Sequence, residues 1–146
     1  MYTVTPIDRM LAEHACERQI KKFATLNDAG DYAALVELFT DDGVFIRPSS
    51  PETPVKGRLA ILDAFKSRPS RVSTHFVCNT VVELVSETEA KASSNILLVC
   101  SAAGNLSTAV ASPPHLIGTF NDTLILQEGI WLFSERAGSI CLKISA

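Results

Sequence analysis

The sequence has no long apolar run and no strong excess of charge of either sign. No stretch approaches the roughly 18 apolar residues that a membrane-spanning helix needs, so we expect no membrane insertion. Residues 1–10 contain Asp8 and Arg9 and lack the apolar core of an export signal, so we expect a cytoplasmic protein. The formal net charge of −3 and the absence of a dense Lys/Arg cluster argue against a nucleic-acid-binding protein.

Signature motifs for metal and cofactor binding are also missing. The cysteines are far apart and include no CxxC pair, so the sequence predicts neither a zinc site nor a disulfide framework. We interpret all four as small buried hydrophobic residues: Cys16, Cys78, Cys100 and Cys141. The histidines are too dispersed for an HExxH site, and P-loop, GxGxxG and GxSxG motifs are absent. We therefore expect no metal ion and no cofactor.

One stretch, residues 47–71, is locally basic. Its cationic residues are Arg47, Lys56, Arg58, Lys66, Arg68 and Arg71. Two interpretations stay open. A solvated loop and helix face is the commoner origin of such a run. The alternative is an anionic substrate or partner near the rim of a pocket.

The sequence does have the composition of a folded protein. Of its 146 residues, 47% are hydrophobic and 20% are charged, which is enough to bury one core. No linker or internal repeat divides the chain, so we expect a single domain over residues 1–146. Helical patterns come first and strand patterns follow, which predicts an α+β fold with helices on one face of an antiparallel sheet.

Three helices are expected in the first half. Apolar residues recur at helical spacing over 12–26, Gly30 can end that helix in a left-handed turn, and Asp31 can cap a second helix over 32–39. The third helix is expected at 58–66. A short strand is expected at 44–46, and a proline-rich loop at 48–56.

Strands are expected in the second half, at 74–85, 90–101 and 116–127. A hairpin turn at Glu128-Gly129 leads into a strand at 130–137, and a last piece follows at 139–144. Residues 102–115 form a long connection that could cover a pocket mouth as a lid.

The strand over 74–84 is apolar on both faces. Simple alternation places His75 and Val81 on one face, and Phe76, Val82 and Leu84 on the other. One face should meet the helices, and the other also needs cover. We therefore expect a homo-oligomer, a dimer or trimer, that forms through the outer face of the sheet.

Five segments together resemble the SnoaL-like branch of the nuclear transport factor 2-like (NTF2-like) superfamily. They are residues 23–32 (FATLNDAGDY), 38–45 (LFTDDGVF), 55–58 (VKGR), 118–122 (GTFND) and 128–136 (EGIWLFSER). The resemblance covers nearly the whole chain. It implies a cone-shaped fold with one pocket, in which N-terminal helices pack on a curved, mostly antiparallel mixed sheet.

Within this superfamily the chain is most similar to the hexachlorocyclohexane dehydrochlorinase and scytalone dehydratase branch. The resemblance implies that Asp28 and His75 form a dyad in which the histidine abstracts a substrate proton. The dehydrochlorinases' active-site Trp falls on Phe45, and their Arg falls on Arg136. We expect Phe23, Phe45, Asn95 and Phe120 around the pocket. Phe45 and Phe120 could form an apolar wall, and packing in the core is the alternative for these aromatic residues.

The chain departs from both families at polar positions. The dehydrochlorinases' Lys falls on Phe23, so that donor is missing. The dehydratases' Tyr falls on Asn27, and their second His falls near Ser94 or Asn95, so both are absent. Both residues of the dyad are present in this chain. Because the other polar residues are absent, the resemblance implies neither family's known substrate.

The residues themselves allow two interpretations of each candidate. His75 can act as a general base when an Asp fixes its tautomer, but a hydrogen-bonded core histidine is the alternative. Asp28 can orient His75, or it can be an ordinary residue at a helix end. Arg136 can polarise a substrate oxygen or a leaving group, or it can pair with Asp122 or Glu135.

We expect a cofactor-free lyase or isomerase that acts on a small apolar molecule. His75 would be the base, Asp28 its orienting partner and Arg136 an electrophilic helper. Two other classes stay open. One is a non-catalytic domain that binds a small molecule in the same pocket, and the other is an assembly subunit like the β chain of a ring-hydroxylating dioxygenase.

Overall fold

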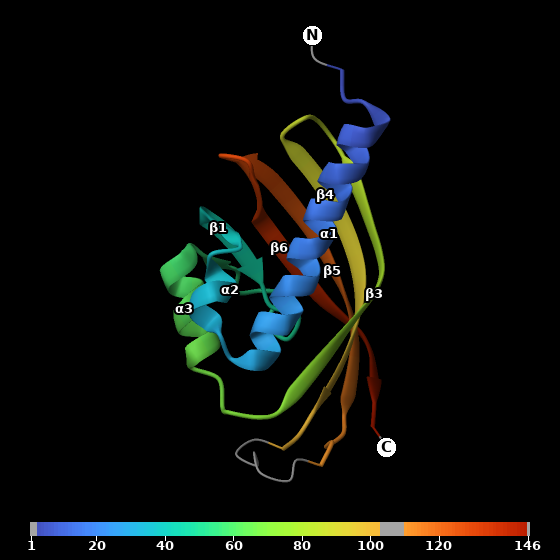
Figure 1. Cartoon of the computed structure of the whole chain (residues 1–146). Helices are drawn as coiled ribbons and strands as arrows, with labels where there is room; N and C mark the ends of the chain where they lie inside the picture. The colour runs from blue at the N-terminus through green and yellow to red at the C-terminus, as the bar shows by residue number, and fades with distance from the viewer. Residues whose placement is uncertain (1–2, 103–109, 146) are drawn as a thin grey trace.

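The computed structural model describes residues 3–102 and 110–145. Its three helices are α1 (Pro6–Ala29), α2 (Tyr32–Val36) and α3 (Arg58–Lys66). The long α1 lies across one face of a curved sheet, and α2 and α3 lie together beside the end of α1 (Figure 1). All three helices therefore precede most of the sheet in sequence and share one side of it. The segment predicted as a lid falls partly on residues 103–109, which lie outside the described residues.

The sheet has six strands: β1 (Phe39–Ile46), β2 (Val55–Lys56), β3 (Ser73–Leu84), β4 (Glu89–Cys100), β5 (His115–Gln127) and β6 (Ile130–Ile144). Their order is β2-β1-β6-β5-β4-β3. β1 and β6 are parallel, and the other neighbouring pairs are antiparallel. The predicted α+β class, with N-terminal helices on a mostly antiparallel mixed sheet, is confirmed.

Helix α1 begins earlier than its apolar spacing predicted. Thr5 precedes the helix, and its hydroxyl accepts a hydrogen bond from the Asp8 backbone N–H at 3.1 Å, while the Asp8 carboxylate accepts one from the Thr5 backbone at 3.2 Å. This capping box satisfies two backbone donors, and Pro6 fits the first helical position. At its other end α1 extends to Ala29, three residues beyond the predicted range. Gly30 then adopts the left-handed conformation that was predicted for it, with φ 72°.

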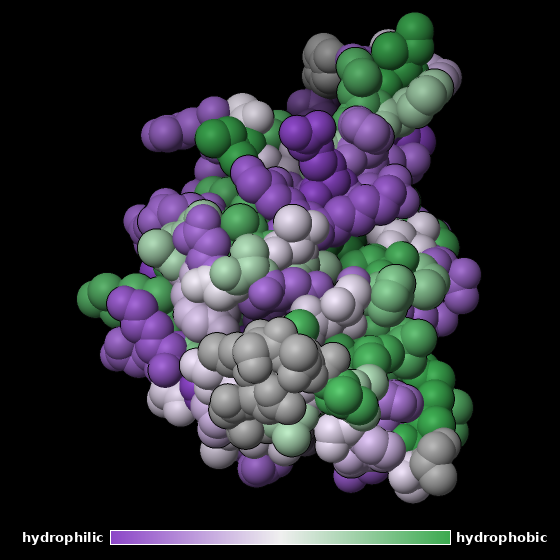
Figure 2. Space-filling view, turned by 60° about the horizontal axis from the view of Figure 1, so that its bottom comes forward, coloured by the Kyte–Doolittle hydropathy of each residue, from purple (hydrophilic) through white to green (hydrophobic). Residues whose placement is uncertain are grey.

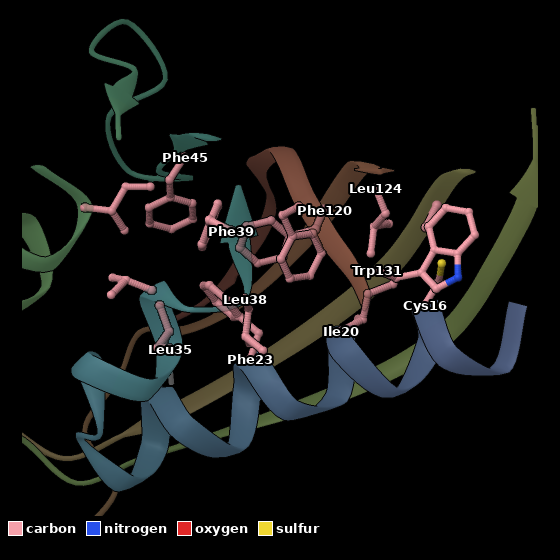
Figure 3. Close-up of a cluster of buried hydrophobic side chains, with 14 of the residues drawn as sticks. Cys16, Ile20, Phe23, Leu35, Leu38, Phe39, Phe45, Phe120, Leu124 and Trp131 are labelled. Atoms are coloured by element: carbon pink, nitrogen blue, oxygen red, sulfur yellow. The ribbon is translucent and has the colours of Figure 1, made fainter. Parts of the chain in front are cut away.

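The core forms where α1 meets the sheet. Cys16, Ile20 and Phe23 lie along one stripe of α1 and are buried. Figure 3 shows these side chains pointing from α1 toward residues of the strands, among them Phe39 and Leu124. The Phe23 ring contacts five other phenylalanine rings edge-on or tilted, at centroid distances of 5.8–6.2 Å: Phe39, Phe45, Phe65, Phe120 and Phe133. Burial of these rings stabilises this end of the sheet.

The second helix is shorter than predicted, and the first strand is longer. Helix α2 ends at Val36, and Phe39 is already in β1, where it pairs with Phe133 of β6. The Leu38 carbonyl accepts a hydrogen bond from the Phe133 backbone N–H at 2.8 Å. Contact with a strand distant in sequence thus overrides the local helical preference of residues 37–39.

Strand β3 changes faces at a bulge, which corrects the predicted alternation. Asn79 has φ 52°, and the pairing register with β4 shifts between Cys78 and Val81. The extra residue inverts the pattern beyond it. His75 faces the helices before the bulge, as do Val82 and Leu84 after it, whereas Val81 is 56% exposed.

The prediction that all four cysteines are buried is wrong for two of them. Cys16 is buried, and its burial raises the pKa of the thiol to about 12. Cys78 and Cys141 are exposed, and Cys100 is half-buried. No described helix is both long and apolar enough to cross a membrane.

The outer face of the sheet, away from the helices, carries exposed apolar residues. Phe76 is 51% exposed, and Leu142 of β6 is 62% exposed. Figure 2 shows hydrophobic surface gathered along one side of the molecule. Single exposed apolar residues are ordinary, but several on one sheet face are typical of a surface that a partner covers.

Candidate active site

A cavity of about 300 Å³ lies between the sheet, the C-terminal half of α1, and α3. Phe23, Phe45 and Phe120, three of the residues expected around a pocket, line it. Aliphatic side chains extend the apolar wall: Ala24, Ala64, Ile96, Leu98, Leu116 and Ile140. A cavity with this lining fits a small and largely apolar molecule.

The structure places Asp28 and His75 in direct contact at this cavity. Asp28 is the second-last residue of α1, and His75 is the third residue of β3, which packs against α1. The His75 Nδ1 atom lies 2.5 Å from Asp28 Oδ1. The His75 side chain lines the cavity and is 13% exposed, and that of Asp28 is 21% exposed. The last turn of α1 thus brings the carboxylate to the start of β3.

Two further hydrogen bonds hold the Asp28 carboxylate in place. The His75 backbone N–H donates to Oδ2 at 2.8 Å, and the Ser73 hydroxyl donates to Oδ1 at 3.1 Å. With both oxygens engaged, the carboxylate has little freedom to rotate away from the imidazole. Ser73 was not among the residues predicted for the site. Its spacing of two residues from His75 in a strand, which puts both on one face, was the available signal.

The second ring nitrogen of His75 remains available. Among the described residues nothing forms a hydrogen bond with Nε2, whereas Nδ1 is bound to Asp28. The Asp28 carboxylate can only accept a hydrogen bond while ionised, so it favours the tautomer with the proton on Nδ1. In this tautomer Nε2 carries no proton, and the His75 ring lines the cavity.

Burial lowers the pKa of His75 below its ordinary value of 6.5. Desolvation of the imidazolium is the largest cause, and the positive charges of Arg68 and Arg71 lower the pKa further. The hydrogen bond and the charge of Asp28 act in the opposite direction. At neutral pH the ring is therefore unprotonated, as a general base must be.

NMR titration of the His75 ring should give a midpoint below 6.5. In Asp28→Asn the midpoint should fall further, because the variant removes the negative charge that favours the imidazolium. His75→Ala assigns the resonance by its loss. A midpoint above 6.5 in the wild type would contradict the described balance of burial and charge.

Arg136 is buried in the core and also borders the cavity. Its Nη1 atom donates to Asp122 Oδ2 at 2.7 Å, so the structure shows the expected pairing with Asp122 and not with Glu135. Its guanidinium carbon lies 4.0 Å from the ring centroid of Phe120 and 4.4 Å from that of Phe23. Arg136 Nε and Asp122 Oδ1 are buried and have no hydrogen-bond partner among the described residues. Each atom could therefore still form a hydrogen bond.

Desolvation is the largest cause of the pKa shifts of Asp122 and Arg136. Burial raises the pKa of Asp122 to about 6, against the charge and hydrogen bond of Arg136, which lower it. Burial likewise lowers the pKa of Arg136. The guanidinium remains protonated in proteins, and Asp122 is ionised at neutral pH, so the pair carries both charges there.

Asn95 does not line the cavity, which corrects its predicted place. Its neighbours Ser94 and Ile96 are buried on the helix side of β4, whereas Asn95 is exposed on the other face, where its amide accepts a hydrogen bond from Thr119. Alternation along β4 separates the two positions that the resemblance left open, and the buried one is Ser94. The Ser94 hydroxyl has no hydrogen-bond partner among the described residues.

Three more arginines line the cavity, and all three belong to the basic stretch 47–71, for which two interpretations were open. They are Arg47 after β1, and Arg68 and Arg71 between α3 and β3. Arg68 donates to Asn27 Oδ1 at 2.8 Å and lies over the Phe65 ring at 4.4 Å. The part of the chain that the structure describes has no group of three or more His, Cys, Asp or Glu side chains that could hold a metal ion.

Solved structures of other proteins share this fold. A hexachlorocyclohexane dehydrochlorinase of type 2 aligns with a TM-score of 0.82 over 97% of this chain and 93% of its own, at 15% identity. A putative scytalone dehydratase from Novosphingobium aromaticivorans aligns with a TM-score of 0.76 over 91% and 86%, at 23% identity. An NTF2-like protein with a cystatin-like fold from the same bacterium gives 0.68 over 90% and 83%, at 19% identity. At these identities the similarity establishes an NTF2-like fold.

A sequence-family model identifies the family within this fold. The model for the SnoaL-like domain matches residues 8–137. The chain therefore belongs to the SnoaL-like family. A sequence comparison with curated proteins gives no match.

Proposed function

We propose that this protein is a cofactor-free lyase or isomerase in which His75 abstracts a proton from carbon. The observation that carries the proposal is the contact of 2.5 Å between His75 Nδ1 and Asp28 Oδ1. The ring lines the cavity, and none of the residues in the described part of the chain forms a hydrogen bond with its other nitrogen. A structural histidine in a core would use both ring nitrogens or lie away from a cavity.

The chemistry follows from the tautomer. With its proton on Nδ1, His75 offers the Nε2 lone pair to a C–H proton of a bound substrate. The electron pair of that C–H bond forms a carbon–carbon double bond and expels a leaving group on the neighbouring carbon, and the imidazolium then gives its proton to that group or to water. Alternatively, in a substrate that already has a neighbouring double bond, the new double bond displaces the electron pair of the old one, which takes the proton back from the imidazolium at the far carbon. The first outcome is elimination and the second is isomerisation. Asp28 stabilises the imidazolium that forms in either case.

Arg136 supplies positive charge at the cavity wall. A leaving chloride or hydroxyl, or a developing enolate oxygen, gains negative charge in the transition state, and a nearby guanidinium stabilises it. The relatives named as a dehydrochlorinase and a putative scytalone dehydratase support a reaction of this class. We do not transfer their substrates to this chain, because the resemblance places the dehydrochlorinases' Lys on Phe23 and the dehydratases' Tyr on Asn27.

A screen of small chlorinated and hydroxylated cyclic compounds tests the proposal. Loss of hydrogen chloride or water is followed by mass spectrometry with the wild type and His75→Ala. We expect at least one compound to react with the wild type and to remain intact with the variant. Equal reaction rates for both proteins would remove His75 from the mechanism.

A small-molecule-binding domain is the second candidate function, and the mostly apolar lining of the cavity favours it. If compounds from the same screen bind to the wild type and none reacts, this function is the better account. An assembly subunit needs no internal cavity, so the observed cavity argues against that third class.

We also propose that the outer sheet face forms a homo-oligomer. Replacing Val81 and Leu142 together with Glu should convert a dimer or trimer into a monomer, because both side chains are exposed on that face. Light scattering after size exclusion measures the mass. Leu59→Glu is the matched control, since Leu59 is 80% exposed on α3. A monomeric wild type would contradict the proposal.

A further inference from the structure

Among the described residues, the charged side chains that line the cavity are all arginines. They are Arg47, Arg68, Arg71 and Arg136, and no described Asp or Glu lines it. The protein as a whole has a net charge of −3. The positive lining is therefore a local feature that runs against the overall composition.

Among the described residues, one of the four arginines has a counter-charge. Arg136 is paired with Asp122 at 2.7 Å. Within the described residues Arg47, Arg68 and Arg71 form no ion pair; Arg47 donates to the Thr53 hydroxyl at 3.1 Å, and its Nε atom is buried without a partner. By contrast, Arg58 lies outside the cavity and contacts both Glu37 and Asp41.

Two of the unpaired arginines, Arg68 and Arg71, lie near His75. Arg68 and Arg71 both lie close enough to His75 for their charges to lower its pKa, and all three border the same cavity. Like charges that gather at one cavity repel one another unless an anion joins them. Guanidinium groups bind carboxylates through paired, charge-assisted hydrogen bonds. The remaining wall, including Phe45, Phe120 and Leu98, is apolar.

We propose that the natural ligand is an amphipathic organic carboxylate. Its carboxylate binds among Arg47, Arg68 and Arg71, and its apolar body lies against the phenylalanines of the cavity. This inference deepens the proposed function, since it rests on the same cavity admitting a substrate and names the class of that substrate. It also gives the locally basic segment 47–71 a role that solvation alone does not.

A matched pair of probes tests the inference by isothermal titration calorimetry. Naphthalene-2-carboxylate and naphthalene-2-carboxamide have the same apolar body and differ in charge. We expect the carboxylate to bind to the wild type about tenfold more tightly or better, and its affinity to fall as salt is added.

Arg71→Gln is the main variant, because no described contact depends on the Arg71 side chain. It should weaken carboxylate binding about tenfold and leave carboxamide binding unchanged. Arg18→Gln is the control, since Arg18 is an exposed arginine on α1 outside the cavity lining, and it should bind both probes like the wild type. Thermal melting followed by circular dichroism verifies that each variant is folded.

Equal affinities for the two probes, or failure of the carboxylate to bind, would overturn the inference. The same titration in His75→Ala separates it from the proposed function. If the carboxylate preference persists in His75→Ala and the wild type turns over no compound, the carboxylate site is supported and the proposed enzymatic function is rejected. If the wild type turns over neutral compounds and shows no preference for the carboxylate probe, the enzymatic function is supported and the carboxylate site is rejected.

Discussion

His75→Ala is expected to lower kcat/KM for a substrate of this cavity by about 10²–10⁴, the usual contribution of a general base. Alanine removes the only unprotonated ring nitrogen that the described residues bring to the cavity. The fold should be retained, because the backbone N–H of residue 75 and the Ser73 hydroxyl still donate to the Asp28 carboxylate. Steady-state kinetics of the wild type and the variant measure the change.

Asp28→Asn should also lower kcat/KM, through the orientation of His75. The amide loses the charge that stabilises the imidazolium, and it can donate a hydrogen bond to Nδ1 and so favour the wrong tautomer. Ser73→Ala is the milder companion, since it removes one of the hydrogen bonds that hold the carboxylate. Activity of His75→Ala within tenfold of the wild type would show that another group is the base.

Asp122→Ala is expected to destabilise the protein by about 3–5 kcal/mol, because it leaves the Arg136 guanidinium buried and unpaired. The Arg136 side chain is 1% exposed, so water cannot replace the lost carboxylate. Urea denaturation measures the free energy of unfolding. Asp63→Ala is the matched control, since Asp63 is exposed on α3 and should change stability little.

Replacing both members of the pair separates charge burial from lost packing. Asp122→Leu combined with Arg136→Met should be less destabilising than Asp122→Ala alone, because no unpaired charge then remains in the core. A double variant that is less stable than the single one would mean that the pair itself holds the core together. A loss below about 1 kcal/mol in Asp122→Ala, the size expected for an exposed pair, would contradict the buried pair described here.

The sequence predicted the fold class well because local patterns and turn residues agreed. Gly30 ends α1 as expected, and Glu128-Gly129 makes the turn between β5 and β6. The misses come from tertiary contacts. Phe39 joins β1 because it pairs with β6, and the bulge at Asn79 inverts the faces of β3. Neither pairing nor bulge leaves a clear mark in a single sequence.

The candidate site likewise contains residues that could be predicted from the sequence and residues that could not. Asp28 and His75 are 47 positions apart, and only the family resemblance linked them before the structure showed their contact. Asn95 was misplaced because a resemblance uncertain by one position changes the face of a strand. The unpaired arginines of the cavity were visible only as a basic stretch, since pairing and lining are properties of the folded chain.

Deuterium incorporation from D2O tests the central claim most directly. A compound that binds in the cavity and carries an acidic C–H bond is incubated in D2O with the wild type, His75→Ala or Asp28→Asn, and the label is followed by NMR. The account predicts that the wild type exchanges one specific carbon-bound hydrogen, that Asp28→Asn does so slowly, and that His75→Ala does not. Exchange by His75→Ala at the wild-type rate would show that proton abstraction does not depend on His75.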